Sequence, residues 1–69
     1  MAICRIKGVD SFGKEHWLVL TRESWYWADE SVASTLYLSH AESLVHEINV
    51  RNLYLDSEDR IAPSIEKDR

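Results

Sequence analysis

The strongest local signal in the chain is the segment SHAESLVHEIN, which occupies residues 39–49. Its first four residues fit the S-x-x-E capping box, in which Ser39 accepts a hydrogen bond from the N–H of Glu42 and the Glu42 side chain returns to the N–H of Ser39. The segment predicts a helix that ends near Asn49 or Asn52, because asparagine tolerates the left-handed conformation at a helix C-terminus. Apolar residues at helical spacing form one stripe along it: Ala41, Leu44, Val45 and Ile48.

Two segments before this helix alternate with the period of two that is typical of strands. In residues 2–9, the apolar Cys4 and Ile6 alternate with two basic residues, which indicates a half-buried strand. Residues 15–22 are apolar on both faces, which indicates a central strand. The intervening residues 10–14 include Asp, Ser and Gly, all turn formers. The sequence therefore predicts a β-hairpin with a five-residue loop.

The remaining strand candidates are less regular. Residues 25–28 and 33–38 both favour extended structure, and the sequence leaves open whether they are two strands or one strand after an ordered loop. Residues 56–59 are expected to form a polar, acidic turn. Residues 60–66 are expected to be the last strand, and Pro63 places it at a sheet edge because proline cannot donate to a strand ladder.

These elements predict an α+β fold. It consists of a small antiparallel sheet of three to four strands with one helix packed on one face, in the order strand, strand, strand, helix, strand. The chain of 69 residues is enough for a single domain, residues 1–69. A chain this short buries only ~60% of the surface that its unfolded form exposes. Self-association would add stability, so a homodimer is one candidate assembly.

Charge and cysteine content narrow the classes of function. Twelve acidic residues against eight basic ones give a net charge of −4. This argues against direct binding to nucleic acid, because phosphate recognition needs a basic surface. The single cysteine, Cys4, cannot form an intrachain disulfide, so we expect a cytoplasmic protein. The N-terminal sequence lacks the apolar core of a signal peptide, and no run approaches the ~20 apolar residues of a membrane span.

Candidate catalytic and metal-binding residues are sparse. His40 and His46 are six residues apart and fall on different sides of a helix, while Glu42 and His46 together supply only two ligands. Cys4 lies on an apolar strand face, unlike the exposed, electropositive position of reactive thiols. The acidic turn lacks the central glycine of a calcium loop. The sequence therefore predicts no enzyme activity, no metal and no cofactor.

The most unusual feature is the aromatic cluster Trp25-Tyr26-Trp27. Tryptophan and tyrosine are common hot-spot residues of protein interfaces, although they also build cores, and Trp17 competes with the cluster for the same core. Acidic residues rim the cluster or form the later turn: Glu23, Asp29, Glu30, Asp56, Glu58 and Asp59. We predict that the aromatic and acidic residues bind a partner protein, with the carboxylates meeting Arg and Lys that normally hold nucleic acid.

The layout of the chain resembles that of small phage and prophage accessory proteins, including some anti-CRISPR inhibitors. The similarity lies in the N-terminal hairpin, a strand ending at Leu38-Ser39, the helix opening at His40-Ala41-Glu42 and the closing strand. The resemblance implies a compact inhibitor that occupies a site on a host nuclease or defence complex. The alternative is a self-associating structural or regulatory domain, which pairs through the edge strand near Ile61–Ile65 or through the exposed sheet face.

Overall fold

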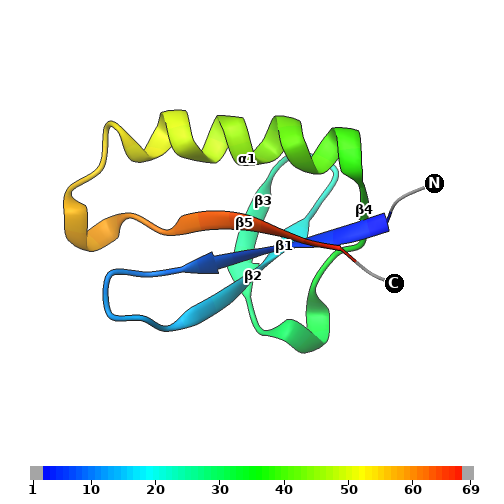
Figure 1. The fold of residues 1–69 in the computed structure, drawn as a ribbon, viewed down its shortest axis with the longest axis horizontal. Coiled ribbons are helices and arrows are strands. Elements are labelled where there is room, and N and C mark those ends of the chain that lie inside the picture. The colour runs from blue at the N-terminus through cyan, green and yellow to red at the C-terminus, as the bar shows by residue number, and fades with distance from the viewer. Residues whose placement is uncertain (1–2, 68–69) are drawn as a thin grey trace.

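The computed structural model describes residues 3–67 and contains a five-stranded antiparallel sheet with one long helix on one of its faces (Figure 1). In chain order the elements are β1 (Ile3–Val9), β2 (Glu15–Leu20), β3 (Trp25–Ala28), the short 3-10 helix η1 (Glu30–Val32), β4 (Leu36–Tyr37), α1 (Leu38–Asn52), the 3-10 helix η2 (Ser57–Asp59) and β5 (Ala62–Lys67). The predicted α+β class is confirmed, and the very short β4 brings the strands to five. None of the helices within residues 3–67 is long and apolar enough to span a bilayer.

β1 is the strand around which the sheet is built. One of its edges pairs with β5 along most of its length. The opposite edge is shared, because β2 pairs with the last residues of β1 and β4 pairs with the first. β3 extends the sheet beyond β2, so the order across the sheet is β3, β2, β1, β5. The prediction that the last strand lies at an edge is confirmed, since within residues 3–67 β5 pairs with β1 alone.

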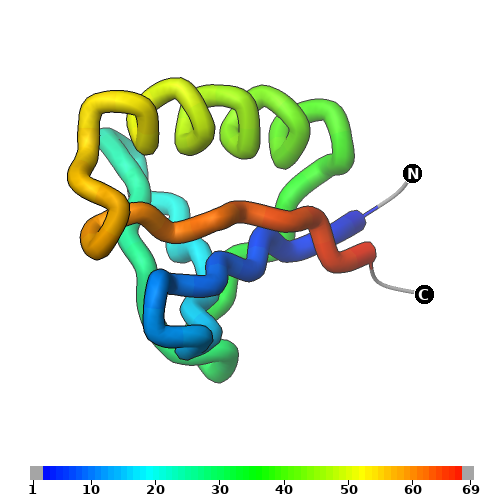
Figure 2. The backbone as a smooth tube through the Cα atoms, turned by 60° about the vertical axis from the view of Figure 1, so that its left-hand side comes forward, coloured from blue at the N-terminus to red at the C-terminus, as the bar shows by residue number. Residues whose placement is uncertain are grey.

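The core lies between the sheet and α1, which forms a separate layer and runs along the direction of β1 and β5 (Figure 2). Alternate residues of the first two strands face the helix, and Cys4, Ile6 and Leu18 have no exposed surface. The stripe predicted for the helix supplies the other side: Ala41, Leu44 and Ile48 are buried, and Val45 packs against them. These two local patterns therefore position the helix correctly over the sheet.

The start of the helix differs from the prediction. The strand expected at 33–38 is confined to β4, η1 separates it from β3, and α1 already begins at Leu38. Tyr37 occupies the N-cap position without a side-chain cap hydrogen bond, so the capping box at Ser39 is wrong. The reason is tertiary: Leu36 pairs with Cys4 of β1, and Leu38 packs against the core immediately afterwards. These contacts fix where the chain turns into the helix.

The helix ends at Asn52, the second of the two predicted stops, but by a different mechanism. Among residues 3–67 no residue other than glycine has a positive φ, and the C-cap residue Leu53 has φ −64°. Asn52 instead donates from Nδ2 to the carbonyl oxygen of Ile61 at 2.8 Å. This hydrogen bond joins the end of α1 to the segment that leads into β5.

The predicted hairpin with a five-residue loop is confirmed. β1 ends at Val9 and β2 begins at Glu15, and the predicted strand start at Ala2 lies outside the described residues. Asp10 Oδ1 accepts hydrogen bonds of 2.9 Å from the N–H groups of Phe12 and Lys14, and Gly13 has φ 82°. A residue with a side chain is strained at that φ, which explains the glycine.

Candidate functional site

The outer edge of β3 carries backbone groups with no strand beside them within residues 3–67. The direction of these groups follows from the pairing. The carbonyl of Leu18 and the N–H of Leu20 both bond to Ser34, on the side of β2 away from β3. Their partners in the β3 register, Trp27 and Trp25, therefore direct their own N–H and C=O groups away from β2, because hydrogen-bonded and non-hydrogen-bonded pairs alternate along an antiparallel ladder.

The two indoles of this strand face α1. Their ring centroids are 5.8 Å apart and their planes are inclined by 77°, an edge-to-face arrangement. Trp25 Nε1 donates to Glu47 Oε2 at 3.3 Å, and the guanidinium carbon of Arg51 lies 5.2 Å from the centre of the Trp25 ring. Both helix residues thus hold Trp25. Two side chains that lie one helical turn apart on α1 fix the position of the indole.

A groove runs between β3, the end of α1 and the segment that follows it. Its volume is about 280 Å³, and its lining includes Trp25, Tyr26, Trp27, Arg51, Leu55 and Asp59. We call it the aromatic groove. A second hollow of about 360 Å³ lies on the other side of Trp25, where Glu23, His40, Leu44 and Glu47 contribute to its lining. Trp25 therefore separates two concave surfaces between the edge strand and the helix.

The structure brings together four of the nine residues predicted to bind a partner, since Trp25, Tyr26, Trp27 and Asp59 all line the aromatic groove. Tyr26 is also exposed on the opposite face of β3, with 51% of its surface accessible. Arg51 and Leu55 complete the groove but were not predicted. The spacing of four residues between Glu47 and Arg51 indicates a pair of side chains on the helix, but it gives no sign that they lie beside β3.

The remaining acidic residues fall in separate places rather than in one patch. Glu23 lies in the turn before β3, and Asp29 follows β3 directly. Glu30 belongs to η1 and pairs with Arg5 at 3.2 Å, on the face of the sheet opposite α1, which we call the far face. Asp56 and Glu58 are exposed around η2, where the carbonyl of Glu58 accepts a 3.1 Å hydrogen bond from Ser11 in the hairpin loop. These carboxylates therefore lie at the two ends of β3, in η1 and around η2, and they do not form one continuous acidic patch.

Trp17 does not share the core with the other two tryptophans. Its neighbour in the register is Ala28, so it lies on the face of the sheet opposite α1. It is only 7% exposed, because Arg5 and Lys7 lie over its ring at 4.6 and 5.9 Å. The competition for one core expected from the sequence is thus relieved by placing the tryptophans on two faces.

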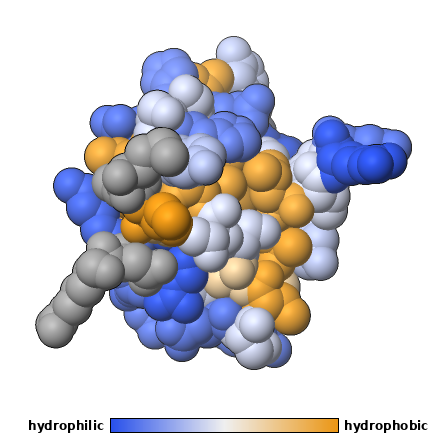
Figure 3. Space-filling model, turned by 90° about the vertical axis from the view of Figure 1, so that its right-hand side faces the viewer, coloured by the Kyte–Doolittle hydropathy of each residue, from blue (hydrophilic) through white to orange (hydrophobic). Residues whose placement is uncertain are grey.

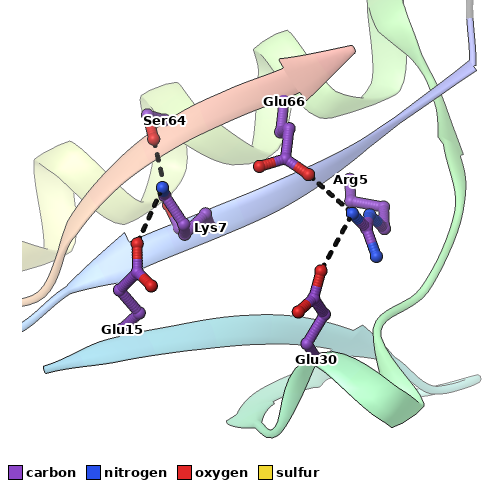
Figure 4. A network of polar contacts seen from close by, with 6 residues as sticks. All are labelled: Arg5, Lys7, Glu15, Glu30, Ser64 and Glu66. Carbon is purple, nitrogen blue, oxygen red and sulfur yellow. Dashed lines mark hydrogen bonds and ion pairs between the residues drawn. The ribbon is translucent and has the colours of Figure 1, made fainter. Parts of the chain in front are cut away.

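Arg5 and Lys7, which cover the ring of Trp17, are held in place by ion pairs (Figure 4 shows the ion pairs). Arg5 Nη2 lies 2.6 Å from Glu66 Oε1, which belongs to β5, and Lys7 Nζ lies 2.8 Å from Glu15 Oε2 on β2. The hydrogen bond and charge of Glu15 raise the pKa of Lys7 above its ordinary value. This network ties three strands and η1 together, so we assign the far face a structural role.

Apolar residues also gather where β4 meets the start of α1, and Figure 3 shows this surface surrounded by hydrophilic residues. A hollow of about 370 Å³ lies there, and its lining includes Ile3, Leu36, Tyr37 and His40. Ile3 and Tyr37 are 41% and 55% exposed. The strand at this end, β4, is only two residues long, so it offers a shorter backbone edge than the four residues of β3 beside the aromatic groove.

Side chains suited to metal binding or nucleophilic chemistry are dispersed. Among residues 3–67 no three His, Cys, Asp or Glu side chains are grouped as a metal ion would require. The Cys4 thiol is buried and lies 3.5 Å from the carbonyl oxygen of Leu36. His16 Nε2 is 2.9 Å from Asp10 Oδ2 at the base of the hairpin loop, where it orders the turn. The arrangement with the most to offer a ligand is therefore the aromatic groove with its strand edge.

We compared the chain with protein families, curated proteins and solved structures. No protein-family model matches the chain, and neither a curated protein nor a solved structure matches it significantly. The resemblance to small phage and prophage proteins therefore stays a prediction drawn from the layout of the chain.

Proposed function

We propose that the chain is a non-enzymatic protein-binding module whose contact surface is the aromatic groove together with the outer edge of β3. The observation that carries this proposal is the coincidence of two features at one place. Trp25 and Trp27 line a concave surface with their side chains and leave their backbone groups open along the same strand. Aromatic anchors in a pocket are typical of interface hot spots.

The charge around the groove supports a protein partner over a nucleic acid. Asp59 and Arg51 both line the groove, and Glu23 and Asp29 lie at the two ends of β3, so acidic side chains outnumber the basic one among these four. Carboxylates at these positions repel phosphates and attract the basic surface of another protein. In this proposal the partner is a nucleic-acid-binding protein of a host, and the chain acts as an inhibitor that occupies part of its surface.

Self-association through β5 is the competing proposal, and it has weaker support. The outer edge of β5 is interrupted by Pro63, which has no N–H to donate to a neighbouring strand. The ladder that a second copy forms there is therefore incomplete. β3 has no proline, and its two tryptophans offer complete pairs of backbone groups.

The test is capture of partners from a nuclease-treated bacterial lysate with two matched variants. Leu55→Asp places a charge in the aromatic groove, while Leu53→Asp makes the same change two residues earlier, at a side chain that is 74% exposed and outside the groove. We expect the wild-type chain and Leu53→Asp to retain the same protein and Leu55→Asp to lose it. Circular dichroism checks that both variants are folded.

Two outcomes would overturn the proposal. Equal retention by Leu55→Asp and Leu53→Asp would place the contact outside the groove. Recovery of proteins only in the absence of nuclease would identify nucleic acid as the bridge. Within the acidic residues, Asp59→Asn is expected to weaken retention more than the double variant of Asp56→Asn and Glu58→Gln, because only Asp59 lines the groove.

A further inference from the structure

We infer that the partner segment docks as an extended strand, antiparallel to β3 on its outer edge, and that it carries two apolar residues flanked by two basic ones at alternate positions. This inference rests on the proposed protein-binding function and specifies the chemistry of the segment that is bound.

The backbone of β3 is suited to the addition of a strand. Trp25 and Trp27 both direct an N–H and a C=O outward, so an incoming antiparallel strand forms two hydrogen-bonded pairs with them. Every strand pairing in this sheet is antiparallel, and the added strand continues that pattern. Main-chain hydrogen bonds of this kind supply affinity in strand addition, while pockets for alternate side chains supply specificity.

Two hollows beside Trp25 can receive side chains of the partner segment. In a paired ladder, residues directly opposite one another point to the same face of the sheet. Partner residues opposite Trp25 and Trp27 therefore point toward α1, where the aromatic groove of about 280 Å³ and the hollow of about 360 Å³ flank Trp25. Both surfaces include apolar side chains from the helix, Ile48 in the first and Leu44 in the second. Apolar partner residues are the complement of such surfaces.

Charge at the ends of β3 defines the flanking positions. Asp29 lies two residues after Trp27 and has an extended backbone (φ −75°, ψ 158°), so it continues the alternation of the tryptophans. Glu23 lies in the tight turn between β2 and β3 and lines the hollow beside Trp25. Both are exposed. A basic residue opposite Asp29 forms a favourable cross-strand pair, and a basic residue at the other end of the added strand meets the carboxylate of Glu23 beside the turn. The partner segment therefore reads basic, any, apolar, any, apolar, any, basic.

The same charges disfavour a second copy of the chain as the occupant. If two β3 strands pair in the antiparallel register that uses both tryptophans of each, the turn that carries Glu23 in one copy comes beside Asp29 of the other, twice in the dimer. Like charges directly opposite one another are destabilising, and charged ends are a common protection of edge strands against self-pairing. These charges therefore disfavour the pairing of β3 with the β3 of a second copy, and they favour the pairing of β3 with a basic segment.

The experiment uses a synthetic peptide with blocked ends, Arg-Thr-Leu-Thr-Leu-Thr-Arg, titrated into the isotope-labelled chain while backbone amide shifts are recorded. Two N-methylated forms serve as a matched pair. Methylation of the two leucine nitrogens removes the N–H groups that point at β3, whereas methylation of the first and last threonine nitrogens affects N–H groups that point away. A third peptide has Glu in place of both Arg.

We expect the parent peptide to shift the amides of Trp25 and Trp27. Methylation of the leucines is expected to weaken binding at least about tenfold, because two hydrogen bonds are lost, while methylation of the threonines changes it less than about twofold. The Glu peptide should bind about tenfold more weakly, and the double variant Glu23→Lys and Asp29→Lys should reverse this preference.

Three results would overturn the inference. The first is an equal effect of the two methylations, and the second is the absence of any amide shift at Trp25 and Trp27. The third is a stable dimer of the wild-type chain in sedimentation that Asp29→Lys strengthens, because such a dimer would already occupy the edge of β3. If one of them occurs while Leu55→Asp still abolishes capture of a partner, strand addition fails and the proposed binding function stands. If Leu55→Asp has no effect on capture, the proposed function itself fails.

Discussion

The guanidinium of Arg51 lies over the indole of Trp25, with 5.2 Å between its central carbon and the centre of the ring. Glu47, one turn earlier on α1, holds the same indole through the Nε1 hydrogen bond of 3.3 Å. Their spacing of four residues favours an ion pair between the two helix side chains. In the structure both side chains contact Trp25 instead, and the position of this indole shapes the aromatic groove.

Removal of this cation should loosen the indole. We expect Arg51→Ala to lower the free energy of unfolding by about 0.5–1 kcal/mol, the size of a partly exposed cation–π contact. Tryptophan emission should shift to longer wavelength as Trp25 gains water. Urea denaturation followed by fluorescence measures both effects. The control is Val50→Ala, at a neighbouring exposed helix position, which should leave the emission unchanged; an identical shift in this control would contradict the assignment.

A methyl group at Gly8 has no space. A Cβ there would lie 2.4 Å from Ile61 Cγ2 and 2.7 Å from Trp27 Cη2, closer than side chains pack. We expect Gly8→Ala to destabilise the fold by about 1–3 kcal/mol through overpacking. Thermal or urea unfolding measures this loss.

The partner variant for this prediction is Gly8→Ala combined with Ile61→Ala. Removal of the Ile61 side chain relieves the closer of the two clashes, so the double variant should be less destabilised than the sum of the single ones. Simple additivity of the two free energies would show that Gly8 and Ile61 do not meet as described.

The pH dependence of stability should include a contribution from Asp10. The hydrogen bond with His16, followed by those from the Lys14 and Phe12 amides, lowers the pKa of this carboxyl below its ordinary value. A depressed pKa means that the ionised group stabilises the fold above the unfolded pKa of about 3.9. That stabilisation is lost as the pH falls through the lowered pKa of the folded chain.

The measurement is the thermal midpoint at about pH 5 and about pH 3, on either side of the ordinary aspartate pKa. Asp10→Asn should lose less stability over this interval than the wild-type chain does. Glu42→Gln, an exposed helix position, should behave as the wild-type chain. Equal losses in Asp10→Asn and the wild-type chain would remove Asp10 from the explanation.

The cover over Trp17 should show coupling between Arg5 and Glu66. Their side chains are 25% and 40% exposed and 2.6 Å apart, so the interaction is only partly screened by solvent. A double-mutant cycle with Arg5→Ala and Glu66→Ala should give a coupling energy of roughly 0.5–1 kcal/mol that shrinks at high salt. A coupling energy of zero at low salt would contradict the network. Arg5→Lys should restore only part of the coupling, because lysine lacks the planar group that stacks on the ring.

Local periodicity accounts for the parts of the fold that were predicted correctly. The strand pattern around Cys4 and Ile6 and the helical stripe from Ala41 to Ile48 both record which face is buried, and the buried faces meet in the core. The start of α1 was misplaced because it depends on the pairing of Leu36 with Cys4. A contact across such a distance along the chain leaves no trace in the residues around Ser39.

The candidate site divides in the same way. Composition alone drew attention to Trp25, Tyr26 and Trp27, because three adjacent aromatic residues are unusual in so short a chain. Their separation from Trp17 depends on the register between β2 and β3, and the contribution of Arg51 and Leu55 depends on where α1 crosses that edge. Both relationships arise only when the sheet and helix are assembled.

The pairing of β1 with β5 has a consequence for the order of events during folding. β1 is the first strand along the chain and β5 is the last, yet the two share the longest ladder of the sheet. During synthesis, the edge of β1 that pairs with β5 stays unpaired until all of the other described elements have been made. Ladders that close over such a sequence distance form slowly, and an open strand edge can recruit other chains in the meantime. A nascent chain that lacks β5 therefore exposes one edge of β1 to pairing with other chains, and the synthesis of β5 removes that exposure.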